Sequence, residues 1–197
     1  MKHLIIYAHP NDQSLNNHFK KTVVEVLQNA GHEIEVRDLY RINFNPVLSL
    51  EDMKGQRMGA VDAGVQKEQA FISRADHITF IYPIWWTGMP AILKGYIDRV
   101  FSYGFAYEYN AGVQKGLLNG RQAVIINTHG KSAAEYAGIG MDKALLLTSD
   151  KGIYSYCGLD VKQHFFFGRA DRAESECIEN WTKQVVSAFD NPDTNTF

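Results

Sequence analysis

Two adjacent tryptophans, Trp85 and Trp86, stand where the chain has to turn. They follow the strand-like run 77–82 (HITFIY), and Gly88 and Pro90 come within four residues after them. Such chain breakers place the indoles at a rim rather than in a core. Flat indoles beside free backbone N–H groups suit a planar heteroaromatic ligand, which needs a stacking surface and polar partners at its edge. A hydrophobic lid or a dimer contact is the alternative interpretation.

The polar segment 9–16 (HPNDQSLN) precedes a helical pattern and offers Ser14 and Asn16 as short hydrogen-bonding side chains. A helix N-terminus has free N–H groups and the positive end of the helix dipole, and it binds phosphate readily. Taken alone, capping of the helix by Ser14 or Asn16 is the better supported interpretation. The segment contains neither GxGxxG nor GxxxxGK[ST], so a dinucleotide fingerprint and a P-loop are excluded.

A third polar segment, 127–132 (NTHGKS), follows another apolar run. Small polar residues after a buried strand can hydrogen-bond the edge of a ring, although a solvated turn explains them equally well. His129 is a candidate acid or base by type, but a single loop histidine is more often exposed. No nucleophile motif of the GxSxG kind is present.

Hydrophobic periodicity shows which elements must position these segments. Five strand-like segments alternate with five helix-like segments, which is typical of a parallel sheet covered on both faces. We expect strands at 4–8, 34–36, 77–82, 122–127 and within 152–167, and helices at 15–30, 65–75, 90–101, 142–148 and 173–189. Ligands of such α/β sheets bind at the carboxyl ends of the strands, where all three polar segments fall. The convergence predicts a flavin on a flavodoxin-like, doubly wound five-stranded parallel sheet with strand order 2-1-3-4-5.

Length and composition fit one domain over residues 1–197, with a frayed polar tail at 190–197. The net charge of -2 gives no sign of nucleic acid as a partner. The two cysteines lie twenty residues apart without metal-ligand spacing, so no metal site is expected. No apolar stretch reaches the roughly 18–20 residues that a bilayer requires. We expect a cytoplasmic protein with no integral membrane segment.

Five motifs together resemble a known family: AHPNDQSLN (8–16), DLYRINFNP (38–46), YPIWWTGMPAILKGYIDRVF (82–101), YGFAYEY (103–109) and YCG (156–158). From about residue 4 to residue 181 the chain is similar to the NAD(P)H:quinone oxidoreductases of the DT-diaphorase type. This group includes the modulator-of-drug-activity B proteins and the ancillary flavoproteins of potassium efflux systems. The resemblance implies a flavin-dependent two-electron transfer by ping-pong, from NAD(P)H to a quinone or a similar acceptor.

The resemblance also assigns roles to individual residues. It implies a flavin phosphate loop of His9, Ser14, Leu15 and Asn16; a ring-lining segment of Pro83, Ile84, Trp85, Trp86 and Thr87; a pyrimidine-side loop of Asn127, Thr128 and Gly130; and substrate-pocket aromatics Tyr107, Tyr109 and Tyr156. In the family a second subunit completes this pocket, which implies a homodimer with active sites at the interface.

The chain departs from the family pattern at the residues thought to relay protons. Tyr136 matches the family's tyrosine with a one-residue shift, the GIGMD segment offers no histidine, and His129 stands where glycine is usual. Tyr136 and His129 are therefore the candidate catalytic residues. FAD is favoured over FMN because Asp98 matches an acidic residue near the adenosine half and Arg172 could reach a diphosphate. The choice between NADH and NADPH stays open.

Two other functions compete with the quinone reductase interpretation. The first is a regulatory flavoprotein that docks on a membrane potassium efflux antiporter. The second is an electron carrier similar to flavodoxin, although such carriers tend to be strongly acidic and this chain is not.

Overall fold

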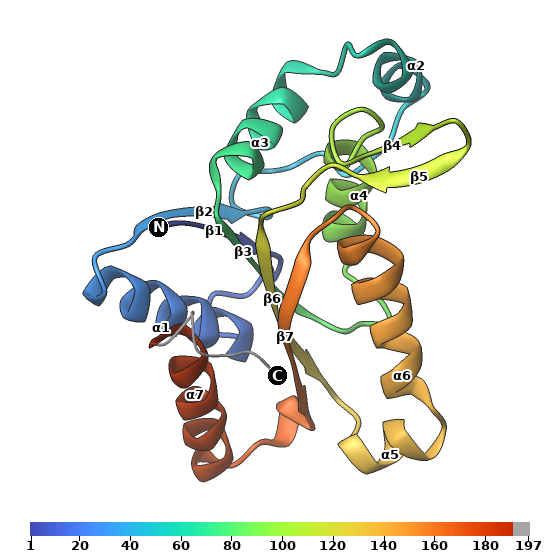
Figure 1. Cartoon of the computed structure of the whole chain (residues 1–197). Helices are drawn as coiled ribbons and strands as arrows, with labels where there is room; N and C mark the ends of the chain where they lie inside the picture. Colours follow the sequence, from blue (N-terminus) through green and yellow to red (C-terminus); the bar gives the residue numbers. More distant parts are fainter. Residues whose placement is uncertain (191–197) are drawn as a thin grey trace.

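The computed structural model describes residues 1–190, and the predicted tail lies outside them except for its first residue. One five-stranded parallel sheet forms the centre of the molecule, in the order β2-β1-β3-β6-β7 (Figure 1). Its strands are β1 (Lys2–Tyr7), β2 (Glu33–Asp38), β3 (His77–Pro83), β6 (Gln122–His129) and β7 (Asp160–Gly168). Counting these five strands along the chain gives the order 2-1-3-4-5, so the predicted fold class and order are confirmed.

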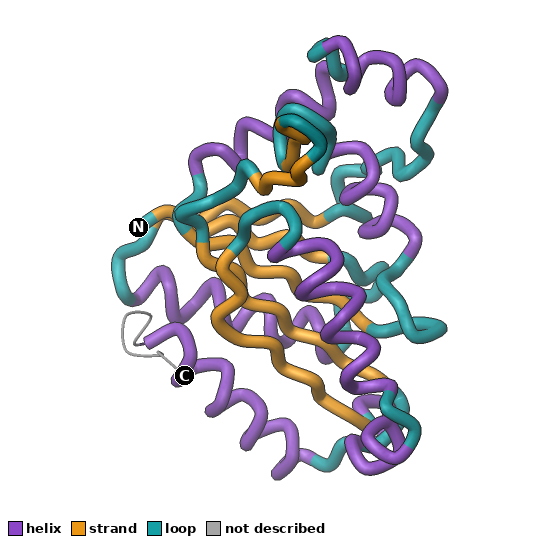
Figure 2. The backbone as a smooth tube through the Cα atoms, turned by 45° about the vertical axis from the view of Figure 1, so that its right-hand side comes forward, coloured by secondary structure: helices purple, strands orange, loops and turns teal. Residues whose placement is uncertain are grey.

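Helices cover both faces of the sheet (Figure 2). They are α1 (Leu15–Asn29), α2 (Leu50–Met58), α3 (Ala63–Arg74), α4 (Ala91–Val100), α5 (Ala133–Gly138), α6 (Met141–Leu146), the wider helical segment η1 (Leu147–Ser155), the short turn η2 (Ala170–Arg172) and α7 (Ser175–Asp190). Helices α1 and α7 pack together on one face, while α3, α4 and η1 contribute to the apolar cluster on the other. None of the helices in residues 1–190 is long and apolar enough to cross a bilayer.

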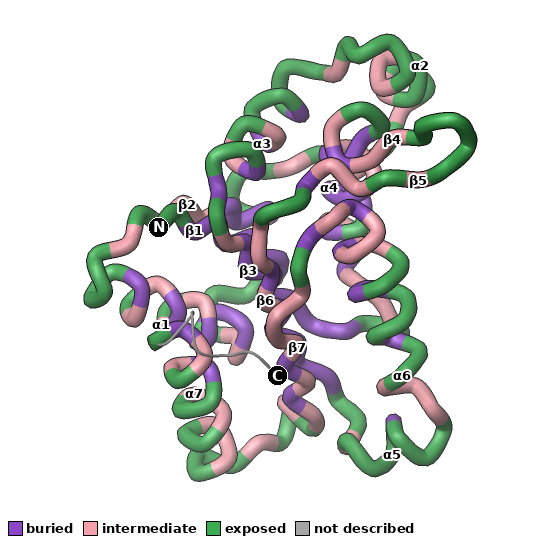
Figure 3. Tube along the Cα trace, in the orientation of Figure 1, coloured by how far each residue is buried: buried purple, intermediate pink, exposed green. Residues whose placement is uncertain are grey.

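Burial on both faces explains the continuous apolar sequence of the central strands. Along β1, Leu4 and Ile6 belong to the apolar cluster beneath α3 and α4, whereas Ile5 and Tyr7 belong to the cluster beneath α1 and α7. All four side chains are almost fully buried, and Figure 3 shows the buried residues concentrated along the strands. Each strand therefore anchors two cores, which fixes the positions of the loops at its carboxyl end.

Two structures absent from the sequence prediction lie at the amino ends of the strands. Helix α2 begins at a capping box made by Ser49 and Asp52. A hairpin joins β4 (Tyr107–Asn110) to β5 (Val113–Gly116) through Ala111 and Gly112, both in the left-handed region. The hairpin strands are four residues long, too short for alternation to reveal them. The predicted helix at 142–148 also continues through η1 to residue 155.

His3 on β1 is buried between two other histidine rings. Its ring stacks on His77 with centroids 4.6 Å apart and lies 4.8 Å from the ring of His32. Neither ring nitrogen of His3 has a hydrogen-bond partner among residues 1–190. Burial, with the repulsion of both neighbouring histidines, lowers the pKa of His3 to about 3. The ring is therefore neutral in the folded protein at ordinary pH.

Replacing His3 with phenylalanine should flatten the acid side of the stability profile. Between pH 6.5 and about 3 the unfolded chain protonates His3 and the folded chain does not, so stability falls as pH falls. One proton contributes a slope of at most about 1.4 kcal/mol per pH unit. Urea unfolding at several pH values measures that slope, with the exposed His18→Gln variant as control. An unchanged slope in H3F would contradict the assignment.

Candidate functional site

The loops after β1, β3 and β6 meet at the carboxyl edge of the sheet. The backbone N–H of Ile84 donates to the carbonyl of Thr128 at 2.8 Å. The amide Nδ2 of Asn16 donates to Thr128 Oγ1 at 2.7 Å, a buried bond between residues 112 positions apart. The rings of His9 and Trp85 have centroids 5.7 Å apart. The convergence expected from the sequence is therefore present in the fold.

The first loop ends at Ser14, which is the N-cap of α1 and accepts a hydrogen bond from the N–H of Asn17. This geometry confirms the capping interpretation. His9 is half-buried, and burial lowers the pKa of its ring, whose Nδ1 accepts from the N–H of Asn11. The first turn of α1 carries no acidic residue. Since the first amides of a helix have no partner inside it, this end keeps its attraction for an anion.

Asn16 provides a test of whether this end of the helix fits a bound group. The residue is 2% exposed, and its Oδ1 is buried without a hydrogen-bond partner among residues 1–190. A buried polar atom without a partner is rare and normally marks a missing donor. A ribityl hydroxyl donates such a bond, and a phosphate suits the neighbouring helix amides. Leu15, half-buried, packs against the apolar cluster beneath α1 and α7.

A tight turn presents the two tryptophans. Trp85 and Gly88 exchange backbone hydrogen bonds of 3.0 and 3.1 Å, and Trp86 and Thr87 between them have φ angles of 51° and 57°. This is the geometry of a type I′ turn, which glycine and asparagine normally occupy. Trp85 is 42% and Trp86 100% exposed, so both indoles lie at the rim as expected. Pro83 closes β3.

Backbone strain is stored at Thr87, because a β-branched residue is a clear outlier in the left-handed region. Thr87→Gly should therefore raise the unfolding free energy of the flavin-free protein by about 1 kcal/mol. The same change should weaken flavin binding, since a glycine turn holds the indoles less firmly. Thermal unfolding and flavin titration measure the two effects. Thr87→Ala keeps Cβ but removes the β-branch and the hydroxyl bond to Trp86 O, so it is the control: an equal gain there would place the strain in the β-branch rather than in the left-handed backbone.

The third segment differs from its prediction as a loop. Asn127, Thr128 and His129 are the last residues of β6 and are 1%, 5% and 5% exposed, so the solvated-turn alternative is wrong for them. Thr128 faces α1 and receives the bond from Asn16. The Asn127 side chain lies on the other face of the sheet and donates to the carbonyl of Tyr82 at 3.0 Å. The loop begins at Gly130, which is exposed.

The two candidate catalytic residues lie against each other. The rings of His129 and Tyr136 are stacked with centroids 4.6 Å apart and an interplanar angle of 8°. His129 is buried rather than exposed as a loop histidine would be, and burial lowers its pKa. Its Nδ1 has no partner in the described part of the chain. A neutral imidazole is therefore positioned at the end of β6, beside Gly130 and next to a phenol.

The predicted substrate-pocket tyrosines form a cluster of their own. The hydroxyls of Tyr109 and Tyr156 are 3.0 Å apart, and the ring of Tyr107 lies 5.4 Å from that of Tyr156. Tyr107 and Tyr109 belong to the hairpin, which lies at the amino ends of the strands, opposite α5 (Figure 1). One chain therefore does not bring these tyrosines to the loops that carry the tryptophans.

The residues that favoured FAD lie at opposite edges of the sheet. Asp98 is near the end of α4, at the amino edge, and pairs with Lys94 at 2.6 Å. Arg172 follows β7 at the carboxyl edge, where its exposed side chain contacts Asp171 at 3.3 Å. Sequence reasoning also missed His164 on β7, whose side chain is 4% exposed. A histidine directly before the aromatic run FFF (165–167) was the available signal, since buried polar side chains need partners.

Comparison with known proteins identifies the class. The pattern of the flavodoxin-like fold family matches residues 1–187, and the chain belongs to this family. An uncharacterized NAD(P)H oxidoreductase of Haemophilus influenzae is 40% identical over 184 residues, covering 91% of each chain. NAD(P)H dehydrogenase (quinone) 1 of Cavia porcellus is 32% identical over 211 residues, covering 95% of this chain and 77% of the relative.

A solved structure agrees with these relatives. The NAD(P)H:quinone oxidoreductase from Methanothermobacter marburgensis superimposes with a TM-score of 0.85 at 30% identity, covering 98% of this chain and 99% of that one. Because the superposition covers 98% of this chain, nearly the whole chain shares its architecture with that oxidoreductase. The resemblance found in the sequence motifs is therefore confirmed.

Proposed function

We propose that the chain is a flavin-dependent NAD(P)H:quinone oxidoreductase. One observation carries the proposal: two features lie together at the carboxyl edge of the sheet. They are a buried hydrogen-bond acceptor without a partner among residues 1–190, Asn16 Oδ1, and a strained turn that exposes two indoles. The first suits the ribityl-phosphate arm of a flavin, and the second suits its flat ring. The oxidoreductase names of relatives that span most of the chain support the same activity.

In this proposal the protein supplies binding and orientation. A bound flavin supplies the two-electron transfer chemistry between nicotinamide and quinone. The helix end at Ser14 holds the phosphate, and the turn at Trp85 and Trp86 supports the ring. The backbone N–H of Gly130, the first residue beyond β6, stabilises negative charge at the pyrimidine edge. His129, kept neutral by burial, and the stacked Tyr136 are the candidates for moving a proton there.

The active form is proposed to be a homodimer. The tyrosine cluster at the hairpin lies at the other edge of the sheet from the flavin loops, so a second copy is needed to bring tyrosines over the ring. Large apolar side chains are exposed around this region, among them Met53, Tyr103, Tyr109 and Val113. Such a patch is typical of a protein interface. We further propose a cytoplasmic location.

FAD is the proposed flavin, with FMN as the alternative. Arg172 lies at the carboxyl edge of the sheet, where its exposed guanidinium can reach a diphosphate. Asp98 lies at the amino edge, so it would meet the adenosine half only in a dimer. Release of the cofactor by heat and its identification by mass distinguishes the two flavins.

Steady-state kinetics with NADH and menadione test the activity. One slot shared by the nicotinamide and the quinone requires a ping-pong order, which gives parallel double-reciprocal lines. Intersecting lines would contradict the shared slot. Purified protein that is colourless and does not bind added FAD or FMN would overturn the proposal itself.

A further inference from the structure

A buried polar chain connects β6, β7 and η1 just below the carboxyl edge of the sheet. Asp150 Oδ1 lies 2.9 Å from His164 Nδ1, and His164 Nε2 lies 2.7 Å from Asn127 Oδ1. Asn127 Nδ2 then donates to the carbonyl of Tyr82, the residue before the end of β3. The side chains of His164 and Asp150 are 4% and 11% exposed. The chain of bonds thus joins η1, β7, β6 and β3. It lies where the two proposed flavin-lining segments begin, at Pro83 and at Asn127.

The donor and the acceptor of each hydrogen bond can be assigned by starting from the Tyr82 carbonyl. The Tyr82 carbonyl can only accept, so the Asn127 amide group must face it with Nδ2. Asn127 Oδ1 therefore faces His164 and needs a donor, which makes Nε2 an N–H. His164 Nδ1 faces a carboxylate oxygen, and two acceptors at 2.9 Å would repel each other. The contact is favourable when a proton lies between them.

We propose that Asp150 holds His164 as a doubly protonated imidazolium, and that this buried pair positions Asn127 and favours binding of the reduced flavin. The inference deepens the proposed flavin site and depends on it. His164 is the positive end of the pair and lies nearer to Asn127, the neighbour of Thr128 in β6. A positive charge in a poorly hydrated place stabilises a nearby developing negative charge. His164 is a positioning residue, since it acts through Asn127.

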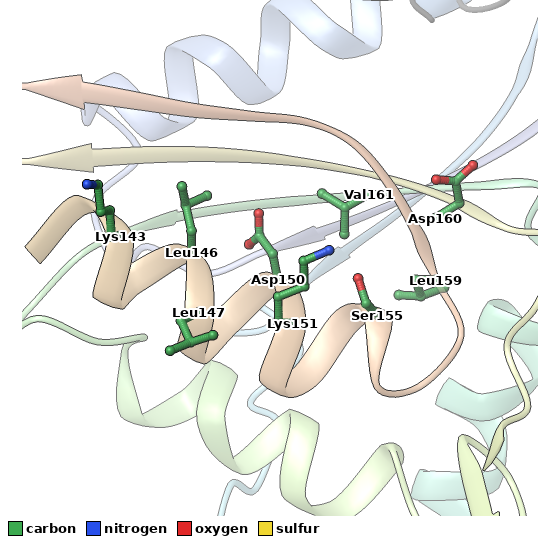
Figure 4. A pocket seen from close by; sticks show the side chains of 9 residues that line it. All are labelled: Lys143, Leu146, Leu147, Asp150, Lys151, Ser155, Leu159, Asp160 and Val161. Atoms are coloured by element: carbon green, nitrogen blue, oxygen red, sulfur yellow. The ribbon is translucent and has the colours of Figure 1, made fainter. Parts of the chain in front are cut away.

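The carboxylate of Asp150 is within reach of solvent. Asp150 lines a surface cavity of about 480 Å³ between η1 and β7. Figure 4 shows its carboxylate pointing from the helix toward the strands, with Lys151 beside it and Asp160 at the start of the strand. The other charged group lining this cavity is Lys143. Solvent therefore reaches the pair from the Asp150 side, while the side chain of His164 is buried.

Further contacts surround the pair of Asp150 and His164. The ring of His164 stacks on Phe166 with centroids 3.9 Å apart, and Ser149 Oγ lies 2.7 Å from Asp150 Oδ1. The buried hydroxyl of Tyr154 lies 3.4 Å from that of Tyr82, and burial raises the pKa of Tyr82 to about 12. A purely structural role for the pair predicts that replacing Asp150 changes neither the protonation of His164 nor the relative affinity of the site for oxidised and reduced flavin.

The first experiment measures the protonation of His164 in the flavin-free protein. Nitrogen-15 NMR of the imidazole rings reports whether each ring nitrogen carries a proton. We expect both nitrogens of His164 to be protonated at neutral pH, and Nδ1 to lose its proton in Asp150→Asn. Asp160→Asn is the matched control, because Asp160 lines the same cavity but pairs with Lys162 at the surface. A bare Nδ1 in the wild-type protein would overturn the proposal.

The second experiment measures flavin binding in both redox forms. Asp150→Asn can still donate to a neutral His164, and His164→Gln can still donate to Asn127 Oδ1, so both variants keep a link and lose the positive charge. His164→Gln in addition leaves the Asp150 carboxylate without its histidine partner. We expect each to weaken binding of the reduced form about tenfold more than binding of the oxidised form. For two electrons this ratio lowers the midpoint potential by about 30 mV. Asp160→Asn should leave the ratio unchanged.

The outcomes separate this inference from the proposed function. Wild-type protein that binds flavin, together with unchanged ratios in D150N and H164Q, would overturn the role of the pair and leave the oxidoreductase proposal standing. Protein that binds no flavin would contradict the proposed function and this inference together. Should D150N fail to fold, the NMR result on the wild type and the ratio in H164Q still decide.

Discussion

Replacing Ser14 with aspartate is expected to weaken flavin binding by roughly a hundredfold to a thousandfold without destabilising the protein. Asp is as good an N-cap as Ser, and its charge interacts favourably with the N-terminus of α1. The helix should therefore remain at least as stable. A carboxylate about 4 Å from the flavin phosphate, however, adds a repulsion of about 3–4 kcal/mol at the dielectric of a protein surface.

The neutral variant Ser14→Asn is the matched control, because Asn has the shape and the capping ability of Asp without the charge. Titration of the flavin-free proteins with FAD and FMN gives the dissociation constants, and thermal unfolding without flavin gives the stability. Equal flavin affinities of S14D and S14N would contradict the placement of the flavin phosphate at this end of the helix. The proposal would then lose the half of the site that Asn16 supports.

The sequence predicts the sheet because each central strand is buried on both faces. Continuous apolar runs such as 77–82 alternate with amphipathic helices, and this pattern allows few arrangements. The site loops follow from the same logic, since ligands bind at the carboxyl ends of parallel strands. Trp85 and Trp86 were recognisable for a related reason: bulky side chains beside Gly88 and Pro90 have no place in a core.

The contacts within the site depend on where each strand ends and on the register between strands. Neither can be predicted accurately from the sequence. β6 runs two residues beyond the predicted end at Asn127, and this extension buries His129. Alternation then sends Asn127 and Thr128 to opposite faces of the sheet. The link from Asn127 to His164 joins residues 37 apart, and no local pattern predicts it. The left-handed turn at Thr87 contradicts local preference and was not predictable either.

Loss of the buried carboxylate of Glu68 should cause the largest change in stability. Glu68 on α3 is 3% exposed and receives hydrogen bonds from Arg37 Nε and Nη2 at 2.9 and 2.6 Å. These bonds hold the pKa of the Arg37 guanidinium above its ordinary value. Glu68→Gln leaves a buried cation without its main partner, so we expect the unfolding free energy to fall by about 3–5 kcal/mol.

Urea unfolding of matched variants separates this charge effect from packing. Glu35→Gln is the control, since Glu35 also contacts Arg37 but its side chain is 45% exposed, and we expect less than about 1 kcal/mol there. The double variant Arg37→Met with Glu68→Leu should recover most of the stability, because apolar side chains of similar volume often replace a buried ion pair without loss. The single change is severe because it leaves the Arg37 guanidinium buried between β2 and α3 without its main carboxylate partner. A double variant as unstable as Glu68→Gln would instead place the loss in the hydrogen bond between Tyr96 and Glu68.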